Sequence, residues 1–548
     1  MNPDRPGRWG LGACIALALL WTCVLALALH GFVAGYFPIA DDWSVLAHSH
    51  PRFAQPLGWF TEGFANYLAQ PAGLSEPYSN FLRPVLNLVY WVLGLWLAPE
   101  SGGYLYFNYS VIGACAGLCL FAANNASSRI AALVLAAALP LMPGFLGSQQ
   151  VLFFPVMGFD PLAAALCLLA AILYARERWI ACAVALLAAA LTKETAMPIA
   201  VALPLLFVVE RRDALRAGER AAWLRFSLLA MPVAVWFVLR YSAFGGMTSG
   251  TYTNVGIGAL VRNIPNCLVQ VPFWSVRGGG VHFDTATLTL VANFIVMASV
   301  LLILARRLLA RMPLRPLEIC FGFAYLFMLN LGIVQRFGAV MDVFLVACIA
   351  MWLGEVESRR FASVAAIGLL IGLVATHRHS LRTFEERSAL LQDDHEIGRR
   401  FVAALRTAPP GSRVMVVNDP VTWFARLDWL LRVEQIPIEA VKLSDVNCSI
   451  PLAPWTQHCD VALAPQGTGE YEFSQSCGIE LCGVPKAHTK LVSWQPAPGV
   501  DAELRPGAMP LPDFAMQARW SSMHIAVADP QARLLYFDPS THDFHFAP

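Results

Sequence analysis

Apolar residues along this chain gather in blocks separated by shorter polar segments. Most blocks hold roughly 15 to 25 residues, which is long enough to cross the roughly 30 Å of hydrocarbon in a bilayer. They lie at approximately 10–33, 84–98, 104–123, 129–147, 160–175, 179–209, 226–244, 285–304, 317–334, 338–354 and 361–376. The pattern predicts an all-α polytopic membrane domain over residues 1–376, with about 11 transmembrane helices.

Composition supports the same interpretation. The 548 residues are 57% hydrophobic and 14% charged, whereas soluble domains are about 45–50% apolar and about 25% charged. A soluble protein of this size would need several folded domains to bury so much apolar surface, and a membrane removes that need. The formal net charge of +1 gives no electrostatic reason to expect a nucleic-acid partner.

Arginine-rich segments orient the predicted helices, because cytoplasmic loops of membrane proteins are enriched in Lys and Arg. Such segments lie at 210–225, at 305–316 and at Arg359–Arg360. The first apolar block is too long for the core of a signal peptide and no small-x-small cleavage site follows it, so we expect a retained helix with a cytoplasmic N-terminus. About eleven crossings then place all three segments inside and the C-terminus outside.

The block 179–209 departs from this scheme. It is long for one span and holds Pro198 and Pro204, so we expect a broken or re-entrant helix here. Counted as one crossing, the block leaves Arg176 and Arg178 on the outer side, against the rule that places positive charge inside.

Ionisable residues near the outer side are the first candidates for chemistry. Lys193 and Glu194 interrupt the long block at a cost of roughly 2.5–3.5 kcal/mol each, so they mark either a functional site or a mutual ion pair. Arg83 and Arg336 stand at outer helix boundaries, where each fits a clamp on a lipid phosphate or an interfacial snorkelling residue. Asp160 opens a predicted helix, where stabilisation of the helix dipole is the local explanation.

An acidic pair, Asp41 and Asp42, follows the first block inside a long aromatic outer loop, 34–83. One carboxylate is suited to act as general base on an acceptor hydroxyl while the other holds a substrate or a metal ion. The alternative is a helix N-cap with a solvated neighbour. A second outer loop, 245–284, is rich in glycine.

Residues 377–548 have a different composition and predict a small periplasmic domain of the α/β or α+β class. A polar helical pattern covers 384–406, and RVMVVNDP (413–420) predicts a buried strand that ends in a turn. The domain holds four cysteines, which permit two disulfides with three pairings: Cys448, Cys459, Cys477 and Cys482.

Several common sites are absent from the sequence. No Walker loop and no GxGxxG after a strand indicates a nucleotide site. The histidines show no zinc-ligand spacing.

A series of motifs resembles the GT-C superfamily of membrane glycosyltransferases, especially its protein O-mannosyltransferase-like branch. The series covers residues 10–355. In chain order it comprises the pair Asp41–Asp42, SNFLRP with Asn80 and Arg83, GYLYFNYSV with Asn108, FDPLAAAL with Asp160, LTKETAMPIAVALP with Lys193 and Glu194, and the late Arg336.

The chain also departs from the family pattern. The second acidic residue is Asp42 where the family often has Glu, and GSQQVLFFP stands in place of the usual H-P turn. FGAVMDVF follows Arg336 instead of a tyrosine run, and the external domain shows no TPR-like or MIR-like repeats. These differences bear on the acceptor more than on the fold.

The resemblance implies a donor sugar carried on a polyprenyl phosphate, which in bacteria is undecaprenyl phosphate. The acceptor would be a glycan, a lipid or a protein on the periplasmic face of the inner membrane, and the sugar would transfer with inversion. Asp41, with Asp42 beside it, would activate the acceptor. The remaining implied roles are donor-phosphate binding by Arg83, Lys193, Glu194 and Arg336, and substrate contacts by Trp43, Asn80 and Asp160. A divalent metal is left open, because some GT-C enzymes use one and the mannosyltransferase-like branch does not.

Two other classes of protein fit the same sequence. A transporter or flippase of lipid-linked glycans predicts two similar halves with paired broken helices near the midplane. A non-catalytic assembly protein would use residues 377–548 as a docking module. The enzyme predicts loss of transfer in Asp41→Asn. Translocation of a lipid-linked substrate without transfer would favour the transporter, and function that survives joint replacement of Asp41 and Lys193 would favour the assembly protein.

Overall fold

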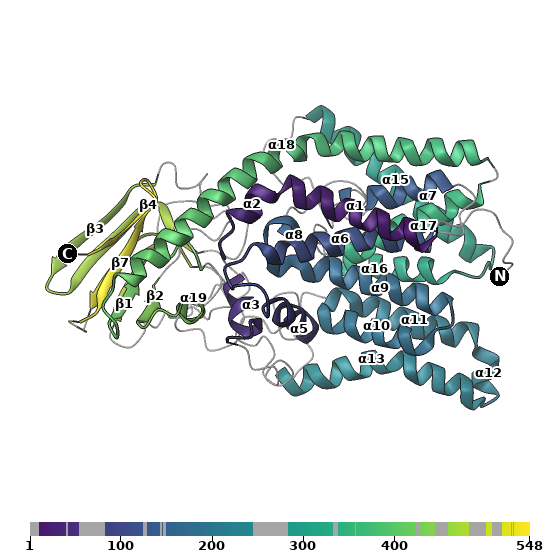
Figure 1. The fold of residues 1–548 in the computed structure, drawn as a ribbon, viewed down its shortest axis with the longest axis horizontal. Coiled ribbons are helices and arrows are strands. Elements are labelled where there is room, and N and C mark those ends of the chain that lie inside the picture. The colour runs from purple at the N-terminus through teal and green to yellow at the C-terminus, as the bar shows by residue number, and fades with distance from the viewer. Residues whose placement is uncertain are drawn as a thin grey trace.

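The protein is described here by a computed structural model, in which a bundle of helices is joined to a smaller β-rich domain by one long helix (Figure 1). The structure describes residues 10–39, 42–53, 83–123, 129–142, 145, 150–244, 283–331, 338–356, 358–422, 427–443, 459–481, 500–506, 518–527, 529 and 531–547. The N-terminal helix begins at the end of the bundle remote from the β-rich domain, which holds the C-terminus.

Helices form the described part of the bundle, and one more, α19, lies beside the β-rich domain (Figure 1). Their bounds are α1 Leu11–Ala28, α2 His30–Ala34, α3 Asp42–Ser49, α5 Pro84–Leu93, α6 Gly103–Ala122, α7 Arg129–Ala138, α8 Gln150–Phe153, α9 Phe159–Ala175, α10 Trp179–Thr192, α11 Met197–Glu210, α12 Arg212–Arg216, α13 Arg220–Phe244, α15 Phe283–Leu309, α16 Pro316–Leu331, α17 Ala339–Glu355, α18 Arg359–Arg406 and α19 Leu427–Glu434. Short 3₁₀ turns are η1 Leu139–Leu141, η3 Pro155–Gly158 and η4 Glu194–Ala196.

The outer surface of the bundle is apolar, as expected for helices in contact with lipid. Among the described residues, three helices are both long and apolar enough to cross a membrane: Leu11–Ala28, Gly103–Ala122 and Arg220–Ser242. Large apolar side chains such as Leu27, Leu224 and Val364 are more than half exposed on the outside of the bundle. A surface of this kind belongs in hydrocarbon, which confirms a helical membrane domain. The number of spans stays a prediction.

Small residues bring α1 and α6 into direct backbone contact. A Cβ atom added to Gly113 would lie 2.3 Å from the carbonyl oxygen of Ala18, and one added to Gly117 would lie 2.6 Å from that of Cys14. The spacing of the two glycines is the small-xxx-small motif of packed membrane helices. This close packing holds α1, which leads through α2 toward Asp42, against α6.

The block 179–209 forms two antiparallel helices, α10 and α11, with the turn η4 between them. Lys193, at the turn, bonds to Asp160 at the start of α9. At the other end of α11, Glu210 accepts a hydrogen bond of 2.7 Å from Tyr174 near the end of α9. Helix α11 therefore runs parallel to α9. The expected break is confirmed, but the single crossing is wrong because the chain reverses direction at η4.

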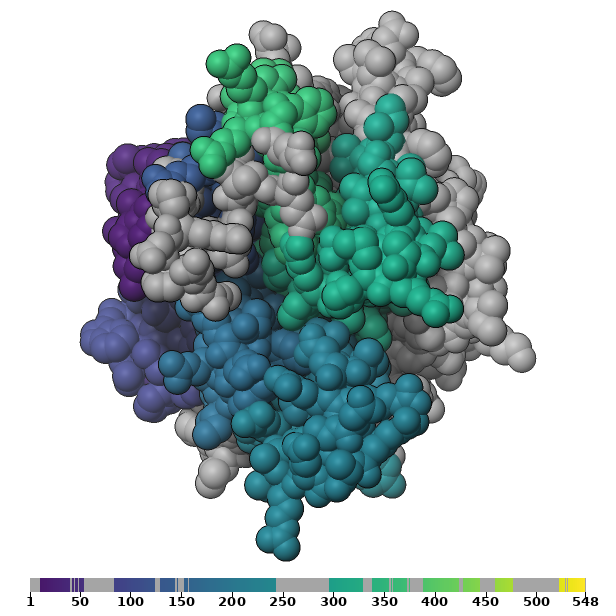
Figure 2. Space-filling view, turned by 90° about the vertical axis from the view of Figure 1, so that its right-hand side faces the viewer, coloured from purple at the N-terminus to yellow at the C-terminus, as the bar shows by residue number. Residues whose placement is uncertain are grey.

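The hairpin of α10 and α11 resolves the conflict between the predicted position of Arg176 and Arg178 and the rule that places positive charge inside. Arg176 and Arg178 now lie at the same end as the arginine-rich segment 210–225, and Arg211 of that segment pairs with Glu177 at 3.0 Å. Figure 2 looks onto this end of the bundle, remote from the β-rich domain. Positive charge thus gathers at one end, as the rule for cytoplasmic loops requires.

The block 84–98, which was predicted to cross the membrane, contains only a short helix. Helix α5 has 10 residues, about 15 Å of rise, which is too short to cross a bilayer. After it the chain returns to Gly102, where an added Cβ would lie 2.1 Å from the carbonyl oxygen of Val33. Both ends of α5 therefore lie on the side of the acidic pair. One crossing lost here offsets one gained at η4, so these two corrections leave the expected number unchanged, and about eleven remains a prediction.

The hairpin can be tested by labelling. A cysteine introduced by Glu177→Cys will react with a membrane-impermeant maleimide in inside-out vesicles and not in intact spheroplasts. The matched variant Glu396→Cys, at an exposed position of α18 on the other side, will show the reverse. Labelling of Glu177→Cys from outside would restore the single crossing.

The β-rich domain contains two sheets. The strands are β1 Arg413–Val416, β2 Glu439–Lys442, β3 Val461–Gly467, β4 Glu470–Leu481, β5 Val500–Pro506, β6 Ala518–Val527, β7 Arg533–Asp538 and β8 Asp543–Phe546. The first sheet has the order β2-β1-β7-β8, with β1 parallel to β2 and β7, and the second is antiparallel with the order β3-β4-β6-β5. The predicted strand within 413–420 is confirmed.

Alternation along β1 places the two sheets against each other. Val414 and Val416 belong to the core that continues into the helices, while Met415 packs with Phe473 and Met523 of the second sheet. Helices α18 and α19 thus cover one face of the first sheet and the second sheet covers the other. The part of 377–548 that the structure describes thus contains helices, one mixed sheet and one antiparallel sheet, where the sequence predicted an α/β or α+β domain.

Helix α18 joins the two parts without interruption. Its 48 residues rise about 72 Å, more than twice the thickness of the hydrocarbon. The predicted division at residue 377 falls inside this helix, and it stays a prediction. Beyond the helix, Cys459 is disulfide-bonded.

Candidate active site

Asp42, the described residue of the acidic pair, follows α2 along the chain. Asp42 opens α3 and is 2% exposed, and its Oδ2 accepts a hydrogen bond of 2.5 Å from the Tyr36 hydroxyl. Burial and the charge of Asp42 raise the pKa of Tyr36 well above its usual range, so the phenol stays protonated and keeps donating. Asp41 lies outside the described residues.

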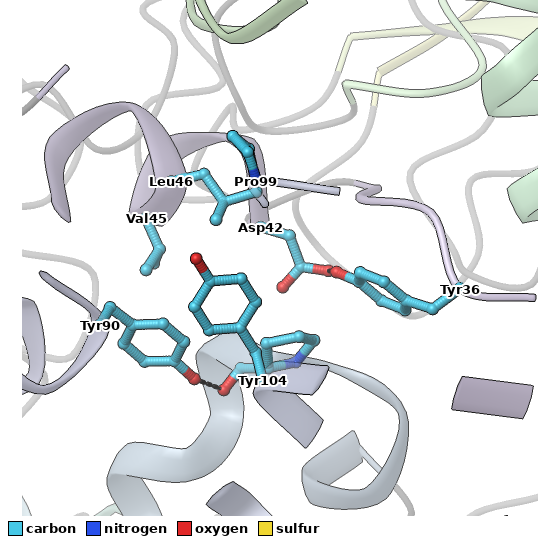
Figure 3. Close-up of a pocket in the computed structure, with 8 residues that line it drawn as sticks. Tyr36, Asp42, Val45, Leu46, Tyr90, Pro99 and Tyr104 are labelled. Carbon is cyan, nitrogen blue, oxygen red and sulfur yellow. Dashed lines mark hydrogen bonds between the residues drawn. The ribbon is translucent and has the colours of Figure 1, made fainter. Parts of the chain in front are cut away.

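Asp42 faces a small cavity, shown in Figure 3. It is lined by Tyr36, Asp42, Val45, Leu46, Tyr90, Pro99, Tyr104 and Pro155. Its volume of about 10 Å³ holds at most one water molecule. The buried hydroxyl of Tyr104 makes no hydrogen bond with the described residues. A polar group that is buried without a partner costs free energy, so it marks a position where a bound hydroxyl would be favourable.

Side chains from α5 and α6 hold the opposite wall of this cavity. Tyr90 donates to the carbonyl of Pro155, and the amide of Asn108 donates to the carbonyls of Phe154 (3.0 Å) and Pro155 (3.3 Å). A Cβ added to Gly158 would lie 2.1 Å from Oδ1 of Asn108, so this turn requires glycine. These bonds fix η3, which leads directly into Phe159 and Asp160.

A cluster of charged side chains surrounds Phe159. The guanidinium carbon of Arg83 lies 4.3 Å from the centre of the Phe159 ring, and Nζ of Lys193 lies 4.2 Å from it. Lys193 bonds to Asp160, and both side chains are almost fully buried. Arg83 is 6% exposed and turns inward, so it does not snorkel to the membrane interface.

Glu194 lies between two arginines. Its Oε2 is 3.3 Å from Arg83 and its Oε1 is 4.0 Å from Arg240, which comes from the outer end of α13. Lys193 and Glu194 thus each pair with another segment of the chain. Together with Lys193 and Asp160 these residues carry three cations and two carboxylates, which leaves one positive charge in excess. We call these five residues the charged cluster: Arg83, Asp160, Lys193, Glu194 and Arg240.

The charged cluster lies close to the cavity. Pro155 lines the cavity and Phe159 carries the cluster, and the 3₁₀ turn between them rises about 8 Å. The second route, along α5 from Arg83 to Tyr90, rises about 10 Å. The cavity beside Asp42 and the charged cluster are therefore linked by one 3₁₀ turn and by about two turns of α5.

The structure brings together most of the residues chosen from sequence. Asp42, Arg83, Asp160, Lys193 and Glu194 lie in or beside the two centres. Asp160 sits in the first turn of α9, as expected for a dipole interaction, and it also bonds to Lys193. Trp43 is fully buried, and its ring packs edge-on at 5.5 Å against the ring of Phe37 beneath the acidic pair. Asn80 and Arg336 lie outside the described residues.

Several residues of these centres were missed from sequence, namely Tyr36, Tyr90, Tyr104 and Arg240. Arg240 carried a usable signal, because an arginine within an apolar segment is costly and by default marks function. The tyrosines carried none, since tyrosine is common at membrane interfaces.

No group of three His, Cys, Asp or Glu side chains suited to a metal ion occurs in the described part of the chain.

The chain matches no known family by its sequence, and no curated protein matches it. Among solved structures it is similar to the apo crystal structure of ArnT from Cupriavidus metallidurans, at 16% identity and a TM-score of 0.35. The likeness covers 82% of this chain and 93% of that chain. At this TM-score the likeness does not establish a shared fold, so function is inferred from the chain's own residues.

Proposed function

We propose that the protein is a membrane glycosyltransferase of the GT-C type, which transfers a sugar from a polyprenyl phosphate to a hydroxyl acceptor. One observation carries the proposal: a buried carboxylate with its own hydrogen-bond donor and a buried cationic cluster are linked by the turn η3 and by helix α5. A base and an anion site held by the same elements match the two ends of a sugar-transfer reaction. The motif series around Asp42, Arg83 and Lys193 supports the same assignment.

The chemistry requires two charges to be handled at once. A carboxylate of the acidic pair accepts the proton of the acceptor hydroxyl, whose oxygen attacks the anomeric carbon. The bond from that carbon to the phosphate oxygen breaks, so the configuration inverts and the lipid phosphate leaves as an anion.

Arg83 and Arg240 are the side chains best placed to bind the leaving phosphate. Guanidinium groups form paired hydrogen bonds with phosphate, and burial strengthens each bond. Their contacts with Glu194 hold both groups toward one point before the donor arrives. Lys193, fixed by Asp160 and Phe159, adds positive charge behind them, and Arg336 completes the set of proposed donor-phosphate residues.

The cavity beside Asp42 is the proposed entry point of the acceptor. Its present volume of about 10 Å³ is far below that of a sugar, so the side chains around it must move apart on binding. The hydroxyls of Tyr36 and Tyr104 would then meet acceptor or sugar hydroxyls. Trp43 and Asn80 are further substrate contacts in this proposal.

We place the reaction on the periplasmic face of a bacterial inner membrane. The site lies at the opposite end of the bundle from the arginine-rich segments, which mark the cytoplasmic side. The disulfide at Cys459 suits the oxidising compartment in which the C-terminal domain would then stand. The acceptor, whether glycan, lipid or protein, would reach the site from that side.

The proposal is tested in proteoliposomes that contain purified protein and undecaprenyl-phosphate hexose or pentose labelled in the sugar. Wild-type protein will release undecaprenyl phosphate in the presence of envelope acceptors and move label to them. Movement of intact donor across the bilayer without any release would instead support the transporter.

A further inference from the structure

The segment that leads to Asp42 is bonded to residues from the opposite end of the sequence. This segment, residues 35–39, follows α2, and we call it the approach. Helix α18 packs along this approach at a level about 54 Å from its own start, beyond the part that crosses the membrane. The function of residues 377–548 is otherwise unassigned.

Two side chains of α18 bind the backbone of the approach. The N–H of Phe37 donates to Nδ1 of His395 at 3.2 Å. Arg399 donates to the carbonyl of Gly35 and, at 3.3 Å, to the carbonyl of Tyr36. Three consecutive residues are therefore tied to one helical turn, and the middle one carries the hydroxyl that bonds to Asp42.

Packing around these bonds is tight. A Cβ added to Gly398 would lie 2.8 Å from the Phe37 ring, so glycine is what allows α18 to approach so closely. The His395 ring lies 5.1 Å from the rings of Phe32 and Tyr36. Burial lowers the pKa of His395 to about 3, and Arg399 adds to the effect. The imidazole therefore stays neutral, and its Nδ1 remains an acceptor.

The other side of the acidic pair is held from the same domain. Arg432 of α19 donates to the carbonyl of Phe53, just beyond α3. Buried apolar residues of α19 and α3, including Trp43 and Leu430, belong to one continuous core. The described segments before and after Asp42 are thus both bonded to the C-terminal part of the chain.

We propose that His395 and Arg399 are positioning residues, through which the C-terminal domain sets the geometry of Asp42 for catalysis. They touch no substrate and act through Tyr36, whose hydroxyl orients the Asp42 carboxylate and stabilises its charge. The proposal rests on the proposed function for its catalytic part, while the structural part stands on the contacts alone.

Variants of His395 separate positioning from simple packing. In His395→Asn, Oδ1 replaces Nδ1 at the same number of bonds from the backbone, so the bond from Phe37 is kept. In His395→Leu the acceptor is lost and apolar volume is kept. Gln392→Leu, at an exposed position one turn earlier, is the matched control.

We expect His395→Leu to speed amide exchange in residues 35–39 at least tenfold in the full-length protein, while His395→Asn and Gln392→Leu change it little. In the labelled-donor assay, kcat of His395→Leu will fall about tenfold with KM for the donor unchanged. Its acid limb of activity will move to higher pH, because Asp42 loses the orienting hydroxyl. Arg399→Gln will act in the same direction and tests the inference if His395→Leu does not fold.

Unchanged amide exchange of residues 35–39 in both His395→Leu and Arg399→Gln would show that these side chains do not hold the segment in place. Faster amide exchange together with a wild-type kcat and pH profile would show that His395 and Arg399 hold the segment without positioning Asp42 for catalysis. Full activity of both Asp41→Asn and Asp42→Asn would instead overturn the proposed function, and the exchange measurement would still decide whether His395 and Arg399 hold residues 35–39.

Discussion

Replacing Asp42 with asparagine will lower the rate of sugar transfer about 10²- to 10⁴-fold, the range that general-base catalysis contributes. Asparagine keeps the size of the side chain and still accepts a hydrogen bond from Tyr36, but it cannot take a proton. Asp41→Asn will abolish transfer if Asp41 is the base and Asp42 its partner. The rates of the two variants therefore assign the two roles within the pair.

The measurement is release of undecaprenyl phosphate from labelled donor in proteoliposomes, normalised to the amount of protein in the membrane. Membrane abundance of both variants will match the wild type, because asparagine is nearly isosteric with aspartate. Asp393→Asn, at an exposed position of α18, is the matched control and will be fully active. Wild-type rates in both Asp41→Asn and Asp42→Asn would remove the acidic pair from the mechanism.

Local sequence properties predicted much of the bundle and part of the site. Apolar block length, the cost of Lys193 and Glu194 in hydrocarbon, and the two prolines beyond them all act within a few residues of the chain. They correctly predicted membrane helices and a break at this point. Asp42 was likewise marked by its own position in an aromatic outer loop.

The direction of the chain after that break was not predictable from the same properties. It follows from the bond between Lys193 and Asp160, which are 33 residues apart in the sequence. A hairpin and a kinked span have the same apolar length, and only the partner of the buried charge distinguishes them. The placement of Arg176 and Arg178 was the one sequence signal in favour of the hairpin, through the rule on loop charge.

Helix α18 shows a related limit. Its apolar part at 361–376 and its polar helical part at 384–406 were predicted as separate elements, and the structure joins them. Helical pattern continues through both, while the change from lipid to water changes only the composition. His395 and Arg399 contact residues 35–37 although they are more than 350 positions away in the sequence, and no local pattern predicts such contacts.

Replacing Arg240 with glutamine will lower kcat/KM for the polyprenyl-phosphate donor about 100-fold, the usual effect of removing one donor that stabilises developing charge. Arg240 lies near the outer end of α13, 8% exposed at its side chain, and faces Glu194 together with Arg83. Its loss removes one of the two guanidinium groups proposed for the leaving phosphate. Arg240→Lys will recover only part of the rate, because an ammonium group lacks the planar pair of donors.

Undecaprenyl phosphate itself gives a readout that does not depend on turnover. It will raise the unfolding temperature of the wild type, by mass action, more than that of Arg240→Gln. The matched control is Arg307→Gln, which removes another buried arginine, 3.2 Å from Glu318 at the opposite end of the bundle. That variant will lose stability, since it weakens a buried ion pair, but its shift with undecaprenyl phosphate and its KM for the donor will remain those of the wild type. Equal shifts in wild type and Arg240→Gln would show that the phosphate binds elsewhere. The same result would separate the charged cluster from the donor and leave it as a structural tie between α5, η4 and α13.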